Sequence, residues 1–265
     1  MHILVTNDDG VYAPGLIALA KAMQLLGKVT ILAPDRNWSA SGHVKTLHRP
    51  LRVKEIVLPD GTPAWTTDGA PSDCVALAVL GVLPESIDLV VSGINPNANF
   101  GHDVTYSGTV TAAMEGAIWD LPSLSFSLDT KENGRKFPFF ETAANIASQI
   151  TQVAIERGIP RNMLLNVNIP NLPAGEIREI RVTRLGLRIY RDELVRREDP
   201  RGKPYYWIGG DEPTGLVEEG TDIGALAENC VSITPIQLDL TAHQCLKEMR
   251  TWDWLPLSGE KPSAD

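Results

Sequence analysis

The sequence predicts an α/β fold with a doubly wound, mostly parallel sheet, and three observations support this class. The chain opens with a strand–helix–strand unit: a strand at 3–6, a helix at 14–26 ended by Gly27, and a strand at 29–33. Such a unit over about thirty residues makes a parallel strand pair with a right-handed crossover. Strands and helices then continue to alternate, until the segment 181–220 interrupts the pattern.

The later elements are apolar runs of strand length separated by runs with helical periodicity. Strands are predicted at 88–92, 123–127, 164–169 and 231–235, and helices at 74–83, 109–119 and 140–157. This alternation is typical of a Rossmann-like sheet with helices on both faces.

Residues 181–220 have no helical periodicity and predict a β-hairpin arm that protrudes from the sheet. The arm carries four large rings, those of Tyr190, Tyr205, Tyr206 and Trp207. An isolated strand pair is marginally stable, so we expect a second copy of the chain to cover these rings. Residues 1–254 are expected to form one domain that includes the arm, followed by a polar tail at 255–265.

Composition limits the classes of partner. The 265 residues include 24 Lys and Arg against 33 Asp and Glu, a net charge of -9. No segment gathers enough basic residues to neutralise a row of phosphates, so duplex nucleic acid is not an expected partner. The longest apolar run, 74–83, is about half the length of a membrane span, so no membrane partner is expected either. The sequence contains three widely spaced cysteines and opens without a secretion-signal pattern, so we expect a cytoplasmic protein.

Ligands of an open parallel sheet bind at the carboxyl ends of its strands, and polar residues follow three predicted strands. Asp8 and Asp9 follow the first, Ser39 lies in the loop after the second, and Asn95 follows the strand at 88–92. Carboxylate, hydroxyl and amide oxygens are the ligands of Mg²⁺, Mn²⁺ or Ca²⁺. The alternative is structural, because Asp, Ser and Asn are also ordinary turn and cap residues.

Ser107, Gly108 and Thr109 directly precede an Ala-rich helix and predict an anion cradle, since a helix N-terminus offers free N–H groups. An ordinary helix cap is the alternative for these residues. His43 lies near these loops as a candidate substrate-binding residue or proton acceptor. No P-loop, dinucleotide fingerprint or G-x-S-x-G elbow occurs, and Cys74 lies in an apolar run, so a metal-activated water is the favoured nucleophile.

Several motifs carry a resemblance to one family. They are TNDDG at 6–10, APDRNWSASG at 33–42, TDGAPSDCV at 67–75, SGIN at 92–95, YSGTVTAAMEG at 106–116, LNVNIP at 165–170 and SITP at 232–235. In this order they resemble the stationary-phase survival protein E family of nucleotidases over nearly the whole chain. The resemblance implies a metal-dependent phosphatase of nucleoside 5'- and 3'-monophosphates, with polyphosphate shortened by some members. It also implies a homodimer or homotetramer with exchanged C-terminal elements.

The resemblance assigns the metal ligands to Asp8, Asp9, Ser39 and Asn95, with one divalent cation per subunit. Mg²⁺ or Mn²⁺ is the expected ion, and Ca²⁺ is a third that oxygen ligands accept. We take Asp8 and Asp9 as the catalytic residues. Substrate binding is assigned to Asn95, Ser107, Gly108, Thr109 and His43, and Asp8, Asp9 and His43 all remain candidate proton acceptors. We expect loss of the Ser107 or Thr109 side chain to reduce turnover with little change in melting temperature.

The sequence departs from the family pattern at two positions near the site. Asn97 stands where a glycine is common, and His102 stands where an aspartate is common. Asn tolerates the left-handed backbone conformation better than most residues, so we expect the loop to keep its shape. The second change removes a negative charge close to the expected phosphate site.

Two other functions compete with a nucleotidase. A zinc-dependent N-deacetylase also begins with acidic residues after a first strand, but zinc favours histidine ligands and this set has oxygen donors. A nucleotide- or sugar-nucleotide-binding module would use the same sheet edge without turnover. Phosphate release from a nucleoside monophosphate, with and without a divalent cation, separates all three.

Overall fold

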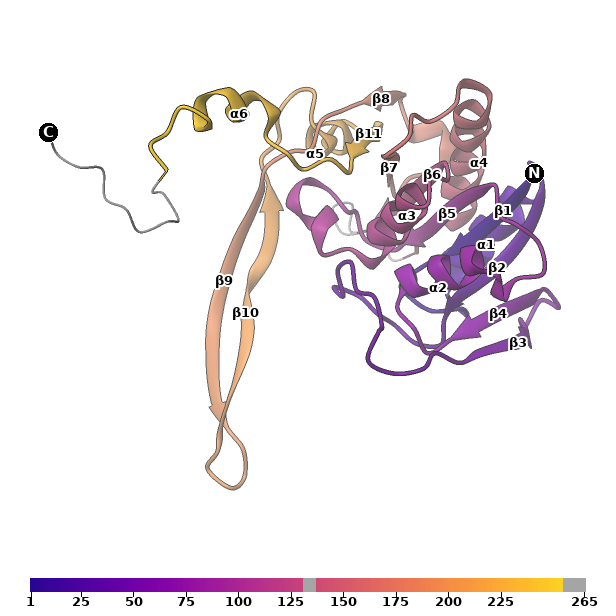
Figure 1. Ribbon diagram of the computed structural model, residues 1–265, viewed down its shortest axis with the longest axis horizontal. Coiled ribbons are helices and arrows are strands. Elements are labelled where there is room, and N and C mark those ends of the chain that lie inside the picture. Colours follow the sequence, from indigo (N-terminus) through magenta and orange to yellow (C-terminus); the bar gives the residue numbers. More distant parts are fainter. Residues whose placement is uncertain (131–136, 255–265) are drawn as a thin grey trace, which may run out of the picture.

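The computed structural model describes residues 1–130 and 137–254, and it confirms the α/β class (Figure 1). Over these residues the main sheet has nine strands in the order β3-β4-β2-β1-β5-β6-β7-β11-β8. Its strands are β1 (His2–Thr6), β2 (Lys28–Pro34), β3 (Val53–Val57), β4 (Pro63–Thr67), β5 (Leu89–Asn95), β6 (Ser123–Asp129), β7 (Met163–Pro170), β8 (Ile180–Val182) and β11 (Val231–Gln237). A second, two-stranded sheet pairs β9 (Arg188–Glu198) with β10 (Pro204–Gly215).

The α-helices are α1 (Pro14–Met23), α2 (Pro71–Leu77), α3 (Gly108–Ile118), α4 (Phe140–Arg157), α5 (Asp222–Ala227) and α6 (His243–Met249). Three further turns of helix are η1 (Ala78–Val82), η2 (Gly101–Thr105) and η3 (Ala174–Glu176). Within the described ranges, no helix combines the length and the apolar character needed to cross a membrane.

The chain winds away from β1 in both directions, which places a ligand crevice at the end of this strand. β1 pairs in parallel with β2 on one side and with β5 on the other, and β5 pairs in parallel with β6. The strand order therefore reverses beside β1, and crevices in open α/β sheets form at such a point. Antiparallel strands occur toward the edges, where β3 pairs with β4 and β11 pairs with β7.

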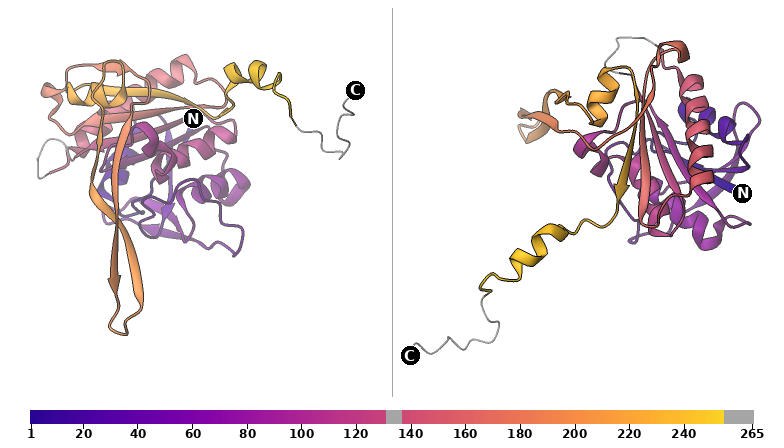
Figure 2. Two further views of the ribbon diagram at one scale, coloured as in Figure 1. Left: turned by 90° about the vertical axis from the view of Figure 1, so that its left-hand side faces the viewer. Right: turned by 90° about the horizontal axis from the view of Figure 1, so that it is seen from above.

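Helices cover both faces of the sheet (Figure 2). Successive side chains of a strand point to opposite faces. Accordingly, Ile3 and Val5 of β1 pack in the core cluster that includes residues of α1 and α4. Leu4 packs on the other side with Cys74 and other residues of α2. Because both faces are buried, β1 is an uninterrupted apolar run rather than an alternating one.

Several boundaries differ from the prediction for local reasons. Helix α1 ends at Met23 rather than at residue 26, because the N–H groups of Leu25 and Leu26 bond carbonyls three residues back and tighten the last turn. The helix predicted at 74–83 begins at Pro71 and becomes irregular beyond Leu77, where Gly81 has a φ of 98°. The strand predicted at 88–92 continues to Asn95. The sequence pattern did not predict β3, β4, α5 or α6.

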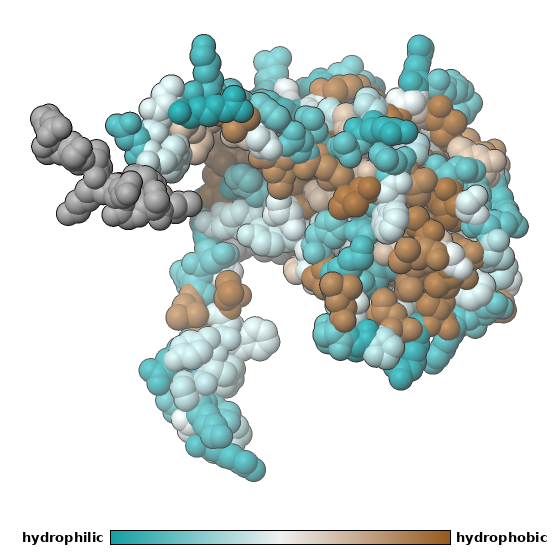
Figure 3. Space-filling model, viewed as in Figure 1, coloured by the Kyte–Doolittle hydropathy of each residue, from teal (hydrophilic) through white to brown (hydrophobic). Residues whose placement is uncertain are grey.

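The predicted arm is confirmed as the β9–β10 hairpin, which stands clear of the body (Figures 1 and 3). The first residues of the predicted segment instead form part of β8, which pairs with β11 in the main sheet. Large side chains along the arm are exposed to solvent, among them Leu194, Tyr206, Trp207 and Ile208 at 71, 55, 62 and 83%. The expected polar tail at 255–265 lies outside the described residues.

A buried carboxylate fastens the base of the arm to the body. Asp222, at the start of α5, is fully buried. It accepts hydrogen bonds from the backbone N–H groups of Gly186, just before the arm, and Gly101, at the start of η2, at 2.7 and 2.9 Å. Gly101 has a φ of 54°, and a Cβ atom there would lie 2.7 Å from the Gly186 carbonyl oxygen, so glycine permits the close approach.

Asp222→Asn should lower the free energy of unfolding by about 1–3 kcal/mol. The variant replaces one carboxylate oxygen with an NH₂ group, which cannot accept a hydrogen bond, so at least one buried backbone N–H donor loses its partner. Chemical denaturation monitored by circular dichroism measures this loss. Asp192→Asn is the matched control, since Asp192 is exposed on β9, and it should change stability by less than about 0.5 kcal/mol. Equal stability of the two variants would show that the Asp222 bonds contribute nothing net.

Candidate functional site

A cavity of about 600 Å³ opens at the carboxyl ends of the central strands. Its lining comes from the ends of β1, β5 and β6, the loop after β2, the start of α3, η2 and the base of the arm. The lining residues are Asp8, Ser39, Ala40, Asn95, Asn97, Ala98, Asn99, Phe100, Asp103, Tyr106, Ser107, Asp129, Arg188, Thr214 and Gly215. The structure therefore brings four sequence-predicted residues, Asp8, Ser39, Asn95 and Ser107, into one cavity.

At the end of β1, Asp8 is buried, whereas Asp9 is half-buried and is not one of the residues that line the cavity. Asp8 is 3% exposed, and burial raises the pKa of its carboxyl, although a hydrogen bond from the Thr109 hydroxyl opposes the shift. Burial, together with the negative charge of Asp8, raises the pKa of Asp9 to about 7. Within the described chain, the Asp9 Oδ2 atom is buried without a hydrogen-bond partner.

These features fit a divalent cation. A buried carboxylate oxygen without a partner, next to a second buried carboxylate, is a costly arrangement that a cation compensates. The described residues contain no group of three or more His, Cys, Asp or Glu suited to a metal. The predicted set has two such residues, so its remaining donors are a hydroxyl and an amide, Ser39 and Asn95. That all-oxygen chemistry suits Mg²⁺, Mn²⁺ or Ca²⁺.

Close packing of two strands positions Asn95. Gly93 of β5 has a φ of 135°, and a Cβ atom there would lie 2.3 Å from the carbonyl oxygen of Phe126 in β6. Asn95 lies at the end of β5 and donates its side-chain N–H to the carbonyl oxygen of Asn97. This bond engages the amide nitrogen, so the oxygen is the atom suited to a cation. Asn97 lines the cavity without adopting the left-handed conformation considered from the sequence.

The start of α3 contacts Asp8 directly. A Cβ atom on Gly108 would lie 2.6 Å from the Cβ of Asp8, so this close approach requires glycine. Thr109 donates its hydroxyl hydrogen to Asp8. Ser107 caps the helix, because its hydroxyl oxygen accepts from the Val110 N–H at 3.1 Å. Ser107 thus has a structural role in addition to the predicted one, and its loss should also destabilise the helix by about 1 kcal/mol.

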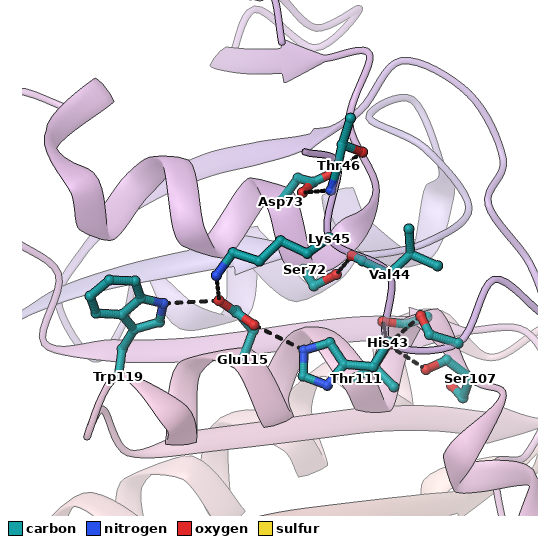
Figure 4. A network of polar contacts seen from close by, with 12 residues as sticks. His43, Val44, Lys45, Thr46, Ser72, Asp73, Ser107, Thr111, Glu115 and Trp119 are labelled. Atoms are coloured by element: carbon teal, nitrogen blue, oxygen red, sulfur yellow. Dashed lines mark hydrogen bonds and ion pairs between the residues drawn. The ribbon is translucent and has the colours of Figure 1, made fainter. Parts of the chain in front are cut away.

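His43 does not line the cavity and instead contacts α3 (Figure 4). Its Nε2 atom lies 2.9 Å from an oxygen of Glu115, which is 3% exposed. Lys45 and Trp119 donate to the other oxygen of Glu115 at 3.0 and 2.9 Å. This arrangement favours a structural role for His43 over substrate contact.

The Glu115 contacts form part of a set that fixes the loop carrying Ser39. Gly42 donates its N–H to the Tyr106 carbonyl at 2.9 Å and accepts from the Thr111 hydroxyl at 3.1 Å. On α2, Asp73 accepts from the N–H and hydroxyl of Thr46 at 2.9 and 2.7 Å. The loop is therefore held against two helices.

Sequence reasoning missed several lining residues. Asp129 ends β6 and is 4% exposed, and the strand-end rule that selected Asp8 could have found it. Arg188 begins β9, far along the chain, and no sequence signal connects it to the strand ends. His102, the second departure from the family pattern, is exposed on η2 and is not one of the lining residues.

The fold and the site define a class: an α/β protein with a mostly parallel central sheet and, at the sheet's carboxyl edge, a buried carboxylate that contacts a helix N-terminus. Comparison with known families makes the class specific. The family model described as Survival protein SurE matches residues 3–192, and the chain belongs to this family.

Individual relatives are similar over nearly their whole length. A protein of Chloroflexus aggregans named 5'-nucleotidase SurE is 52% identical over 254 residues, which cover 96% of this chain and 100% of the relative. A protein of Geobacter sulfurreducens with the same name is 47% identical over 264 residues, covering 100% of this chain and 97% of the relative. The crystal structure of the SurE protein from Aquifex aeolicus aligns with a TM-score of 0.81 and 43% identity, covering 94% of this chain and 98% of that one.

The Glu115 cluster predicts a pH-dependent contribution to stability. Burial opposes ionisation of Glu115, but hydrogen bonds from His43, Lys45 and Trp119 outweigh it and lower its pKa from 4.5 to about 2. Between these two values the unfolded chain binds more protons than the folded one, so this stability is present above pH 4.5 and is lost as pH falls toward 2. Its size is on the order of 3 kcal/mol.

Urea unfolding of wild type and Glu115→Gln across this pH range measures the effect. The wild type should be the more stable at pH 6, and the difference should shrink as the solution is acidified toward pH 3, because the unfolded wild-type chain then takes up a proton on Glu115 that the folded protein does not, and the variant has no such group. Glu156→Gln, at an exposed position of α4, is the matched control. A Glu115→Gln deficit that stays constant with pH would contradict the assigned pKa.

Proposed function

We propose that this protein is a 5'-nucleotidase that hydrolyses nucleoside 5'-monophosphates to nucleoside and phosphate. The observation that carries the proposal is the contact of the buried Asp8 carboxylate with the N-terminus of α3, beside the half-buried Asp9 whose Oδ2 atom has no hydrogen-bond partner in the described chain. The pair offers a site for a cation, and the positive end of the helix dipole favours an anion. A phosphate monoester bound between them meets both requirements of phosphoryl transfer, positioning and charge neutralisation. Family membership and the names of the relatives support the same activity.

In this proposal, Asp8, Asp9, Ser39 and Asn95 hold one Mg²⁺ or Mn²⁺ ion, and Ca²⁺ fits the same donors. When bound, such an ion supplies positive charge at the phosphoryl group and acidifies a water ligand. Thr109 and Gly108 hold Asp8 in place through the contacts described above. The Gly108 and Thr109 N–H groups interact with Asp8, and the Val110 N–H bonds the Ser107 hydroxyl oxygen. The phosphoryl oxygens are therefore attracted by the positive end of the α3 dipole and by the Ser107 hydroxyl hydrogen. The engagement of His43 with Glu115 favours the aspartates over His43 as the proton acceptor.

The wider activities suggested by the family resemblance are part of this proposal. The cavity of about 600 Å³ has room for a whole nucleotide, so 3'-monophosphates and polyphosphate ends are further candidate substrates. An N-deacetylase is disfavoured because the lining residues include no histidine. A non-catalytic nucleotide-binding module would have the same geometry, so only a measurement of turnover distinguishes it from a nucleotidase. A cytoplasmic location also stays a prediction.

We further propose a homodimer or homotetramer assembled through the arm and the C-terminal segment. Helix α6 buries none of its residues, and Figure 2 shows it away from the body in two views. Beside it, Leu240, Trp252 and Trp254 are exposed by 93, 50 and 64%. Together with the rings of the arm they form apolar surface that a second copy would bury.

Wild-type protein should release phosphate from AMP with Mg²⁺ or Mn²⁺, and EDTA should abolish the release. Asp8→Asn and Asp9→Asn should each lower kcat/KM at least about a hundredfold, because a charged hard ligand becomes neutral. Calorimetric titration should show that both variants bind Mn²⁺ more weakly than the wild type. Phosphate release and Mn²⁺ titration are measured on the same preparations.

Asp120→Asn is the matched control, because Asp120 is exposed beyond α3 and its φ of 58° suits Asn equally. It should retain wild-type turnover and Mn²⁺ affinity. Phosphate release unaffected by EDTA would contradict the metal-dependent mechanism. Tight AMP binding without any phosphate release would favour the binding module.

Replacing residues 192–210 with a short Gly-Ser linker should lower the mass measured by light scattering, because it removes the exposed rings while keeping the arm's base. The base stays joined through the Arg191–Asp211 pair. Affinity for Mn²⁺ should stay within about twofold, since the proposed ligands are elsewhere. A wild-type mass of one chain at micromolar concentration, or an unchanged mass in the shortened variant, would show that the arm is not an assembly surface.

A further inference from the structure

One wall of the cavity is a stack of flat groups at the base of the arm. The guanidinium carbon of Arg188 lies 4.5 Å from the centre of the Phe100 ring. Its Nε atom lies 2.9 Å from a carboxylate oxygen of Asp103, and the side chain is only 12% exposed. Tyr190, two residues along β9, donates its hydroxyl hydrogen to the other oxygen of Asp103 at 2.6 Å. Arg188 is thus held on one face and on one edge.

This arrangement leaves Arg188 suited to a planar neutral group rather than to a phosphate. Phe100, which is 4% exposed, covers one face of the guanidinium, while Arg188 itself lines the cavity. The ion pair with Asp103 compensates its positive charge, which weakens its attraction for a phosphate dianion. A fixed guanidinium plane is a good stacking surface for a nucleobase.

A second planar group lies in the same lining. Tyr106 is 60% exposed and comes directly before Ser107, so its ring lies beside the proposed phosphate cradle. An exposed aromatic ring in a cavity is a stacking surface that tolerates any base. The cavity therefore has an acidic end at Asp8 and a planar wall formed by Arg188 and Tyr106.

We propose that Arg188, seated on Phe100 and held by Asp103, is a specificity-determining residue that stacks on the nucleobase of the substrate, with Tyr106 as a second stacking surface. This inference rests on the proposed function, because it names the part of the cavity that receives the nucleoside. It assigns recognition of the nucleobase to the residues where the hairpin arm joins the body. The phosphoryl group is bound at the ends of β1 and β5 and at the start of α3.

The experiment compares AMP with ribose 5-phosphate, which shares the sugar and phosphate and lacks the base. Wild type should favour AMP in kcat/KM. Arg188→Met should raise KM for AMP about tenfold, the loss expected for one stacking contact, and change kcat/KM for ribose 5-phosphate less than about twofold. Arg188→Lys should behave like Arg188→Met, since Lys keeps the charge and lacks the plane.

Arg191→Met is the matched control, because Arg191 is exposed farther along β9 and does not line the cavity. It should keep the wild-type preference for AMP. If the Arg188 variants do not fold, Tyr106→Ala and Tyr106→Phe supply the test: the first should lose the preference for AMP selectively, and the second should retain it.

Equal losses on both substrates would overturn the inference, since Arg188 would then serve the phosphate end or the fold. Recovery in Arg188→Lys would overturn it as well, because charge rather than stacking would then be the cause. Calorimetric titration with adenosine, which has no phosphate, tests the same wall without turnover. Weaker adenosine binding in Arg188→Met supports the inference even if wild type releases no phosphate, an outcome that would contradict only the proposed function. Unchanged adenosine binding would overturn it.

Discussion

Burial of two adjacent carboxylates at the end of β1 is the constraint on which the rest of the site depends. Asp8 and Asp9 lose hydration at the point where the strand order of the sheet reverses, and the negative charge of Asp8 further raises the pKa of Asp9. Helix α3 approaches so closely that only glycine fits at residue 108, and Thr109 donates to Asp8. The same helix end that stabilises Asp8 carries the positive end of the helix dipole, which favours an anion in the proposed phosphate site.

Helix α3 organises the site at two levels. Its first turn contacts Asp8, and its later residue Glu115 receives bonds from His43 and Lys45, which fix the loop that carries Ser39. A shift of this helix would therefore move the proposed phosphate site and the loop together. The helix is buried along most of its length, which resists such a shift.

Asp222 has a comparable role on the other side of the cavity. Its two bonds join η2 to the chain segment that enters the arm, and Arg188 and Tyr190 add contacts from the arm to Asp103. Residues 106 and 107 also donate their N–H groups to the Asp103 carbonyl at 3.0 Å. The base of the arm is thus continuous with the entrance to α3, so the proposed assembly through the arm would have a structural connection to the cavity.

The sequence by itself determined the alternating strands and helices, the arm and the gathering of Asp8, Ser39, Asn95 and Ser107, because local periodicity and the strand-end rule are readable in short segments. It misplaced the end of α1 and missed α5 and α6, whose signals are short or depend on packing. Only the tertiary structure decided the partners of His43, the bridge at Asp222 and the entry of Arg188 into the cavity. The His43–Glu115 contact joins residues that are 72 positions apart along the chain, and the Asp222–Gly101 bond joins residues 121 positions apart. Arg188 likewise meets Asp103 from a distant part of the sequence. Over such separations no local pattern specifies which side chains meet.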